Sequence, residues 1–103
     1  MSGKKPPPLA VVLKDIRVIP VMTVHDPNEA FETARALALG GFSVLEITLR
    51  TSHAWPALKR MQNELPELVL GVGTVTKTEQ LKQASEFGAQ FAVSAFLNES
   101  LIE

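Results

Sequence analysis

The stretch FSVLEITLR, from Phe42 to Arg50, places charged and polar groups inside an otherwise apolar segment. Side chains alternate between the two faces of a strand, so one face of this segment carries Val44, Glu46, Thr48 and Arg50. A carboxylate and a guanidinium in an apolar strand lose hydration free energy unless they are paired or used. The pattern therefore leaves two interpretations open: a functional site on one face of the strand, or a structural ion pair between Glu46 and Arg50.

The rest of the chain repeats the unit to which this strand belongs, namely an apolar strand, a turn, an amphipathic helix and a glycine, at a spacing of about 25 residues. The expected strands are 17–23, 42–48, 68–71 and 90–94, and the expected helices are 9–14, 27–39, 52–65 and 77–86, with the start of another at Asn98. Asp26 is the expected N-cap of the second helix, with Pro27 at its first position. The segment Thr76 to Glu79 predicts a capping box for the helix that follows it.

This alternation of strands and helices predicts an α/β fold built from right-handed parallel βα units. Either an open doubly wound sheet or a (β/α) barrel satisfies it. Glu46 favours the barrel, because an open sheet covered by helices on both faces has no place for a carboxylate. A complete barrel usually takes about 250 residues. We therefore expect a flexible tail at 1–8 and, at 9–103, the N-terminal half of one TIM-barrel domain with four strands.

The composition, 46% hydrophobic and 20% charged, is that of a soluble globular domain. A net charge of −1 with scattered Lys and Arg predicts neither a nucleic-acid partner nor a membrane partner. The absence of cysteine excludes a thiol nucleophile and a disulfide framework. No apolar run is long enough for a membrane span, and a cytoplasmic location is the default expectation.

The segment Gly71-Val72-Gly73-Thr74 is expected where the third strand gives way to a loop, the position at which barrel enzymes place substrate-binding groups. Its glycines allow backbone amides to approach an anion, and Thr74 adds a hydroxyl. The alternatives are a tight turn or the start of a dinucleotide fingerprint, whose third glycine position holds Thr76 here. His25 and His53 are expected at the surface or at helix caps and are too isolated for a metal site, so no metal is expected.

The segments V-L-E-I-T-L-R, G-V-G-T-V and F-A-V-S, in this order and at these distances, resemble the first half of the 2-keto-3-deoxy-6-phosphogluconate (KDPG) and 4-hydroxy-2-oxoglutarate (KHG) aldolases. R-V-I-P-V and A-L-A-L-G-G support the resemblance, which covers roughly residues 10 to 101. It implies a TIM barrel, a homotrimer and a cytoplasmic lyase of carbohydrate metabolism in the Entner–Doudoroff pathway. The implied class I reaction needs no cofactor and reversibly cleaves KDPG to pyruvate and glyceraldehyde 3-phosphate, with pyruvate held as a Schiff base on a lysine. The resemblance further implies that Glu46 is the general acid/base and that Arg50, Gly73 and Thr74 bind the substrate, a keto acid.

Two features depart from the family pattern. The Schiff-base lysine of the family lies in a K-F-F-P-type strand of the second half, which this chain does not contain. The lysines of this chain fall in the expected tail and helices: Lys4, Lys5, Lys14, Lys59, Lys77 and Lys82. We therefore expect the chain alone to be inactive. The second departure is Ser94-Ala95-Phe96, where the family usually has Ser-Pro, which changes the loop after the fourth strand. Two other functions stay open: a non-catalytic βα unit that serves assembly, and a phosphate- or nucleotide-binding module based on the glycine segment.

Overall fold

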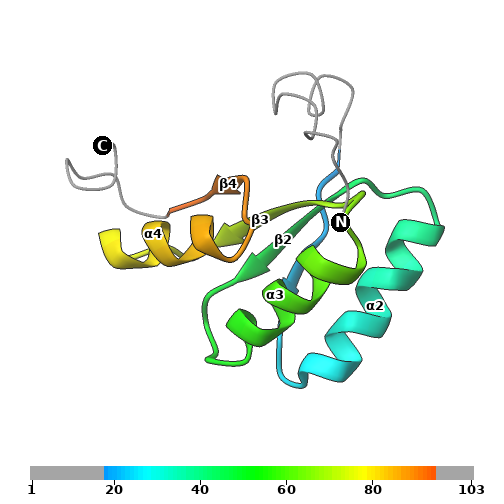
Figure 1. The fold of residues 1–103 in the computed structure, drawn as a ribbon, viewed down its shortest axis with the longest axis horizontal. Coiled ribbons are helices and arrows are strands. Elements are labelled where there is room, and N and C mark those ends of the chain that lie inside the picture. Colours follow the sequence, from blue (N-terminus) through cyan, green and yellow to red (C-terminus); the bar gives the residue numbers. More distant parts are fainter. Residues whose placement is uncertain (1–17, 95–103) are drawn as a thin grey trace.

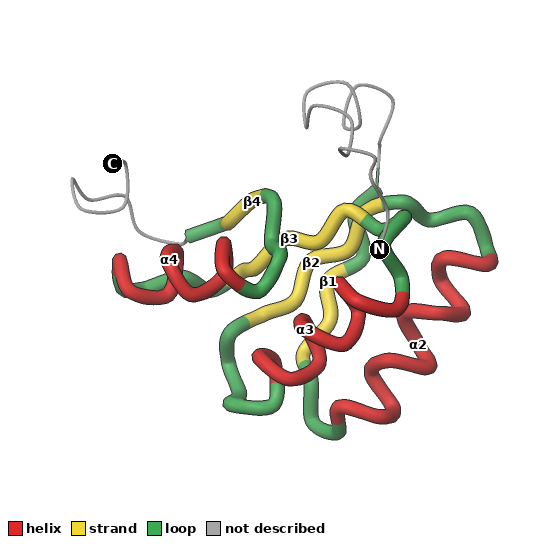
Figure 2. Tube along the Cα trace, viewed as in Figure 1, coloured by secondary structure: helices red, strands yellow, loops and turns green. Residues whose placement is uncertain are grey.

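The computed structural model describes residues 18–94, which form a parallel sheet whose strands are joined by helices (Figure 1). The strands are β1 (Val21–Thr23), β2 (Val44–Thr48), β3 (Val69–Gly73) and β4 (Phe91–Ala92), and they lie side by side in chain order. The helices between them are α2 (Pro27–Leu39), α3 (Ala54–Glu64) and α4 (Thr78–Glu86) (Figure 2). The predicted parallel βα units are confirmed. The predicted tail at 1–8, the helix at 9–14, and residues 95–103 with the Asn98 cap lie outside the described residues.

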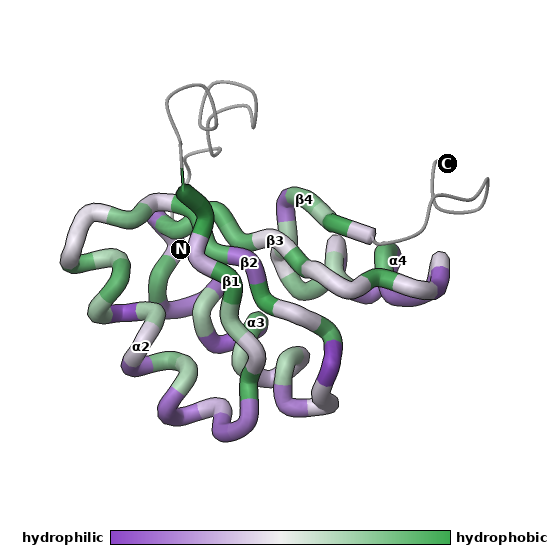
Figure 3. The backbone as a smooth tube through the Cα atoms, turned by 180° about the vertical axis from the view of Figure 1, so that it is seen from behind, coloured by the Kyte–Doolittle hydropathy of each residue, from purple (hydrophilic) through white to green (hydrophobic). Residues whose placement is uncertain are grey.

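The hydrophobic core lies between one face of the sheet and the helices. Leu45 and Ile47 of β2 are buried there with residues of α2 and α3 such as Phe31 and Leu58. Seen from behind, in Figure 3, the strands lie in front of α2 and α3, so the opposite face of the sheet carries neither helix. We call this opposite face the inner face.

The ends of the helices follow from their capping residues. At the start of α2 the Asp26 side chain accepts a hydrogen bond from the backbone N–H of Asn28 at 3.0 Å, and Pro27 occupies the first position, as predicted. At α4 the predicted capping box was one residue early. Gln80, rather than Glu79, accepts from the backbone N–H groups of Lys77 and Thr76, at 3.1 and 2.8 Å.

The strands differ from the prediction at their ends. β1 begins at Val21 rather than at residue 17, because Pro20 has no N–H to donate to a neighbour, although its carbonyl accepts from the Glu46 N–H at 3.0 Å. β3 continues to Gly73, paired with Thr48 of β2. The predicted end of this strand at Gly71 was therefore two residues early, while the segment Gly71-Val72-Gly73-Thr74 does contain the change from strand to loop, which starts at Thr74.

Candidate active site

The register of the sheet brings residues of different strands together in rows on the inner face. Residues paired in a parallel register point to the same side of the sheet. One row, the Glu46 row, consists of Val21, Glu46, Gly71 and Phe91. The next row towards the carboxyl ends of the strands, the Thr48 row, consists of Thr23, Thr48 and Gly73. Polar side chains thus gather on the inner face near the carboxyl ends, where parallel α/β proteins bind ligands.

Each glycine of β3 makes room for a side chain of a neighbouring strand. A Cβ built on Gly73 would lie 2.8 Å from Cδ of Glu46, and closer still to its Oε2. The Glu46 carboxylate therefore lies over Gly73, one row nearer the carboxyl ends than its own Cα. A Cβ built on Gly71 would in the same way lie 2.5 Å from Cδ2 of Phe91, whose ring covers that glycine.

The Glu46 carboxyl is half-buried, and this burial raises its pKa above the ordinary value. The side-chain ion pairs within residues 18–94 join Glu32 to Arg35 and Glu64 to Arg60, so neither involves Glu46. Arg50 lies in the exposed turn after β2. The alternative of a structural Glu46–Arg50 ion pair was therefore wrong for the described part of the chain, and Glu46 remains as a desolvated acid without a counter-charge.

Thr48 is buried, with 5% of its surface exposed, and its hydroxyl shares a hydrogen bond of 2.9 Å with the hydroxyl of Thr23. Each hydroxyl has one proton, so a single shared bond leaves the pair one further donor. Thr23 was not a predicted site residue. Its own strand gives no signal, because only the pairing of β1 with β2 brings it beside Thr48.

Thr74 is the first residue after β3 and adopts a φ of 61°. This left-handed conformation is unusual for a β-branched residue and costs conformational free energy. Such strained residues cluster at functional sites. Thr74 directly follows the glycine on which Glu46 lies, so two of the predicted site residues are brought to the same end of β3.

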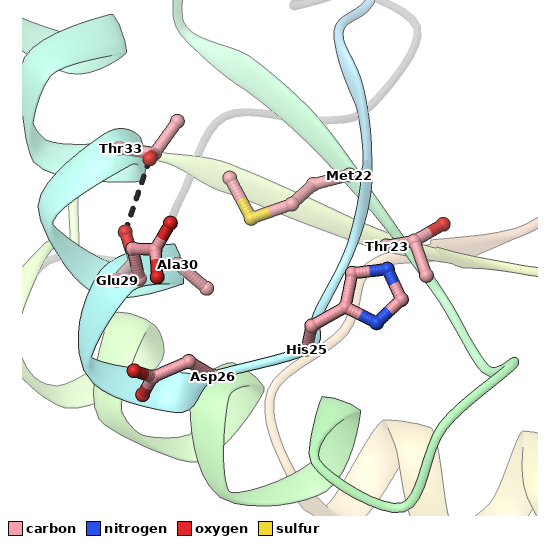
Figure 4. A pocket seen from close by; sticks show the side chains of 7 residues that line it. All are labelled: Met22, Thr23, His25, Asp26, Glu29, Ala30 and Thr33. Atoms are coloured by element: carbon pink, nitrogen blue, oxygen red, sulfur yellow. Dashed lines mark hydrogen bonds between the residues drawn. The ribbon is translucent and has the colours of Figure 1, made fainter.

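The remaining candidates lie elsewhere. A hollow of about 130 Å³ lies between β1 and the start of α2, where the Met22 side chain points towards the helix (Figure 4). Met22 lies on the face opposite to Glu46, whereas Thr23, which also lines the hollow, belongs to the Thr48 row. His25 lines the hollow, and both His25 and His53 are exposed, as predicted. Between residues 18 and 94 no group of three His, Asp or Glu side chains is placed to hold a metal ion.

The described lysines all lie away from the inner face. Lys59 is on α3 with its Nζ 5.9 Å from the centre of the Phe87 ring, Lys82 is on α4, and Lys77 precedes α4. All three are exposed. The other three lysines of the chain lie outside the described residues. None of the helices at 18–94 is long and apolar enough to span a membrane.

Helices on one face of a parallel sheet, with polar side chains gathered near the strands' carboxyl ends on the other face, are the arrangement found in part of a (β/α) barrel. The family model described as KDPG and KHG aldolase matches residues 9–103. The chain therefore belongs to the KDPG/KHG aldolase family.

Similar proteins agree with this assignment. The KHG/KDPG aldolase of Escherichia coli is 44% identical over 86 residues, which make up 84% of this chain and 40% of that protein. A KDPG aldolase of Legionella pneumophila, with pyruvate captured as a covalent carbinolamine intermediate, superimposes with a TM-score of 0.77 at 38% identity, covering 82% of this chain and 41% of that one. The Zymomonas mobilis KDPG aldolase with 3-phosphoglycerate gives a TM-score of 0.75 at 44% identity, covering 81% and 39%. The chain thus spans about two-fifths of the length of these relatives.

Proposed function

We propose that this chain supplies the N-terminal part of a class I aldolase that reversibly cleaves KDPG to pyruvate and glyceraldehyde 3-phosphate. By the same proposal the complete enzyme is a cytoplasmic homotrimer of the Entner–Doudoroff pathway that works without a cofactor. The observation that carries the proposal is the Glu46 carboxyl, which is desolvated, without an ion-pair partner, and located at the carboxyl ends of the strands in a chain of this family.

In this proposal Glu46 moves protons while pyruvate is bound to a lysine as a carbinolamine and then as an imine and enamine. A carboxyl group whose pKa is raised by burial accepts a proton more readily than an ordinary glutamate, which favours its use in general acid/base catalysis. Arg50, in the turn after β2, and Thr74, after β3, bind the substrate carboxylate, whereas the space over Gly73, also expected to contact substrate, holds the Glu46 carboxylate. A guanidinium suits this role because it can donate two parallel hydrogen bonds to a carboxylate.

The Schiff-base lysine comes from outside this chain in the proposal. The exposed positions of Lys59, Lys77 and Lys82 support this, because a nucleophilic amine needs a desolvated or cationic setting that lowers its pKa. The pyruvate carbinolamine in the Legionella relative supports the same chemistry for the complete enzyme. Residues 9–103 then form the half of the barrel that supplies the acid/base group and part of the carboxylate site.

The structure does not favour the alternative function as a phosphate- or nucleotide-binding module. It depended on open space beside Gly71 and Gly73, and that space is occupied by the Phe91 ring and the Glu46 carboxylate. A carboxylate over Gly73 repels a phosphate at this position.

The proposal is tested with a chimera that joins residues 9–103 to the remaining sequence of the Escherichia coli KHG/KDPG aldolase. We expect the chimera to cleave KDPG and to form a pyruvate imine that borohydride traps. Its Glu46→Gln variant should fold equally well and lose cleavage. A folded chimera that traps pyruvate but cleaves neither KDPG nor KHG would overturn the proposal.

A further inference from the structure

We propose that Gly73 is a positioning residue that sets the conformation of Glu46: the missing Cβ on β3 is the seat that holds the carboxylate at the carboxyl ends of the strands. The catalytic meaning of this seat rests on the proposed function, whereas the seat itself does not. It also gives Gly73 a role other than the backbone contact to substrate predicted from its sequence.

The geometry of the seat involves Glu46 alone. The three atoms nearest to a Cβ built on Gly73 are all from Glu46, namely Oε2, Cδ at 2.8 Å and Cγ at 3.3 Å. Heavy atoms cannot approach a real Cβ as closely as Oε2 and Cδ do here. Any side chain at position 73 therefore has to displace the Glu46 carboxylate, and the displaced group is the far end of the side chain rather than backbone.

The Glu46 row itself offers no space for the carboxylate over β3. Gly71 is the register partner of Glu46, and the Phe91 ring fills the space above it. The Glu46 side chain therefore cannot lie over β3 in its own row, while the space over Gly73, one row further, is open to it. The two glycines of β3 thus have complementary effects. Gly71 accepts the Phe91 ring, which excludes the carboxylate from the Glu46 row, and Gly73 provides the space that the carboxylate occupies in the Thr48 row.

The conformation of the Glu46 carboxylate depends on the space over Gly73 rather than on an ion pair. The inner-face residues of the strands around it are all uncharged: Val21, Thr23, Val44, Thr48, Val69 and Phe91. The charged groups nearest in sequence at this end of the sheet, Arg50 and His25, are exposed in the turns after β2 and β1. A glutamate side chain loses rotamer freedom when it is fixed, and this loss opposes a single conformation. The space over Gly73, which fits the Glu46 carboxylate, therefore helps to keep this side chain in one conformation.

A double-mutant cycle on the 103-residue chain tests the seat. Thermal unfolding is measured for the unmodified chain, Gly73→Ala, Glu46→Ala and the double variant, all at one protein concentration because association alters the midpoint. We expect Gly73→Ala to lower the midpoint by several degrees and to have little effect in the Glu46→Ala background. Gly40→Ala is the matched control, because its φ is −81° and its Cβ would be 3.4 Å from the nearest atom, so the midpoint should hardly change.

Two further readouts separate positioning from packing. In ¹³C spectra the Glu46 carboxyl of folded Gly73→Ala should titrate closer to the ordinary value than in the unmodified chain, because the carboxylate moves out to solvent. In the chimera, Gly73→Ala should slow exchange of the pyruvate methyl protons at least tenfold while imine trapping is retained.

The proposal would be overturned if Gly73→Ala lowered the melting midpoint equally in the unmodified chain and in the Glu46→Ala variant. An unchanged titration of Glu46 in folded Gly73→Ala would also overturn it. If Gly73→Ala alone does not fold, recovery of folding in the double variant supports the seat, and failure to recover refutes it. If the double-mutant cycle shows that the effect of Gly73→Ala depends on Glu46 but the chimera is inactive, the result counts against the proposed function and not against the seat.

Discussion

Replacing Glu46 by Gln removes a charge at nearly constant shape and separates a catalytic carboxyl from a structural one. Burial raises the pKa of this carboxyl, so the charged form is disfavoured in the folded chain. The unfolded chain therefore releases this proton at a lower pH than the folded chain does. The contribution of Glu46 to stability falls as the pH rises from the ordinary glutamate value through the folded value, and stays lower above it.

Gln has no such dependence, so we expect Glu46→Gln to be more stable than the unmodified chain at pH 7. The gain is at most about 1.36 kcal/mol for each tenfold decrease in acidity that burial causes, and it is smaller here because the half-buried carboxyl keeps part of its hydration. At a pH below the ordinary glutamate pKa both forms are neutral, and the difference should vanish. A buried ion pair predicts the opposite sign, because removing one partner destabilises by about 3–5 kcal/mol. Urea unfolding at pH 7 and at low pH distinguishes the two.

The same substitution in the chimera should slow exchange of the pyruvate methyl protons with deuterated water by about 10² or more, the usual scale for a lost general base. Two factors of ten correspond to about 2.7 kcal/mol of transition-state stabilisation. Proton NMR follows the exchange, and borohydride trapping should show that imine formation is partly retained. Glu64→Gln is the control, since Glu64 pairs with Arg60 on α3, away from the inner face. Normal exchange in Glu46→Gln, or a loss of stability at pH 7, would refute the reasoning.

Four other outcomes are expected. Arg50→Ala in the chimera should raise the pyruvate concentration needed for half-maximal imine trapping, and an unchanged concentration would remove Arg50 from the carboxylate site. Thr74→Asn should raise stability in urea by about 0.5–1 kcal/mol, because Asn tolerates the left-handed conformation better, while weakening pyruvate binding. The 103-residue chain alone, treated with pyruvate and borohydride, should gain no adduct mass, and a stoichiometric adduct on any lysine would contradict the argument from lysine placement. In sedimentation at low micromolar concentration this chain should associate, because Val21 on the edge strand β1 is 61% exposed and, among residues 18–94, no strand pairs with the outer edges of β1 and β4. A single 11 kDa species with cooperative melting would argue against this.

The sequence predicted most reliably those features that depend on neighbouring residues alone. The start of α2 was predicted correctly because Asp26 and Pro27 act within one turn of each other. The order of strands and helices followed from the period of the apolar residues. The capping of α4 was misplaced by one residue, because both Glu79 and Gln80 can reach back to the backbone and only the structure decides between them.

The site was predictable only in part for a related reason. Glu46 could be identified from its own strand, since a carboxylate among apolar residues is conspicuous there. The partners of Glu46 lie on other strands, and the sequence of one strand does not determine which residues of a neighbouring strand pair with it. Thr23 beside Thr48, and Gly73 beneath the carboxylate, both follow from pairings of β2 with its neighbours.

The error at β3 is itself informative about the site. Glycine is depleted in strands and weakens them by roughly 0.5–1 kcal/mol relative to alanine, and the strand was predicted to end at Gly71. Both glycines are nevertheless paired in β3 and buried, and each has a side chain of an adjacent strand lying over it. Thr74 then adopts a backbone conformation that a β-branched residue rarely takes. Local preference and the observed structure therefore disagree at three of four consecutive positions, all at the end of the strand that supports Glu46. Such disagreements are expected where function overrides stability, and two of these three residues, Gly73 and Thr74, are the ones that we propose to position the acid/base group and to bind the substrate.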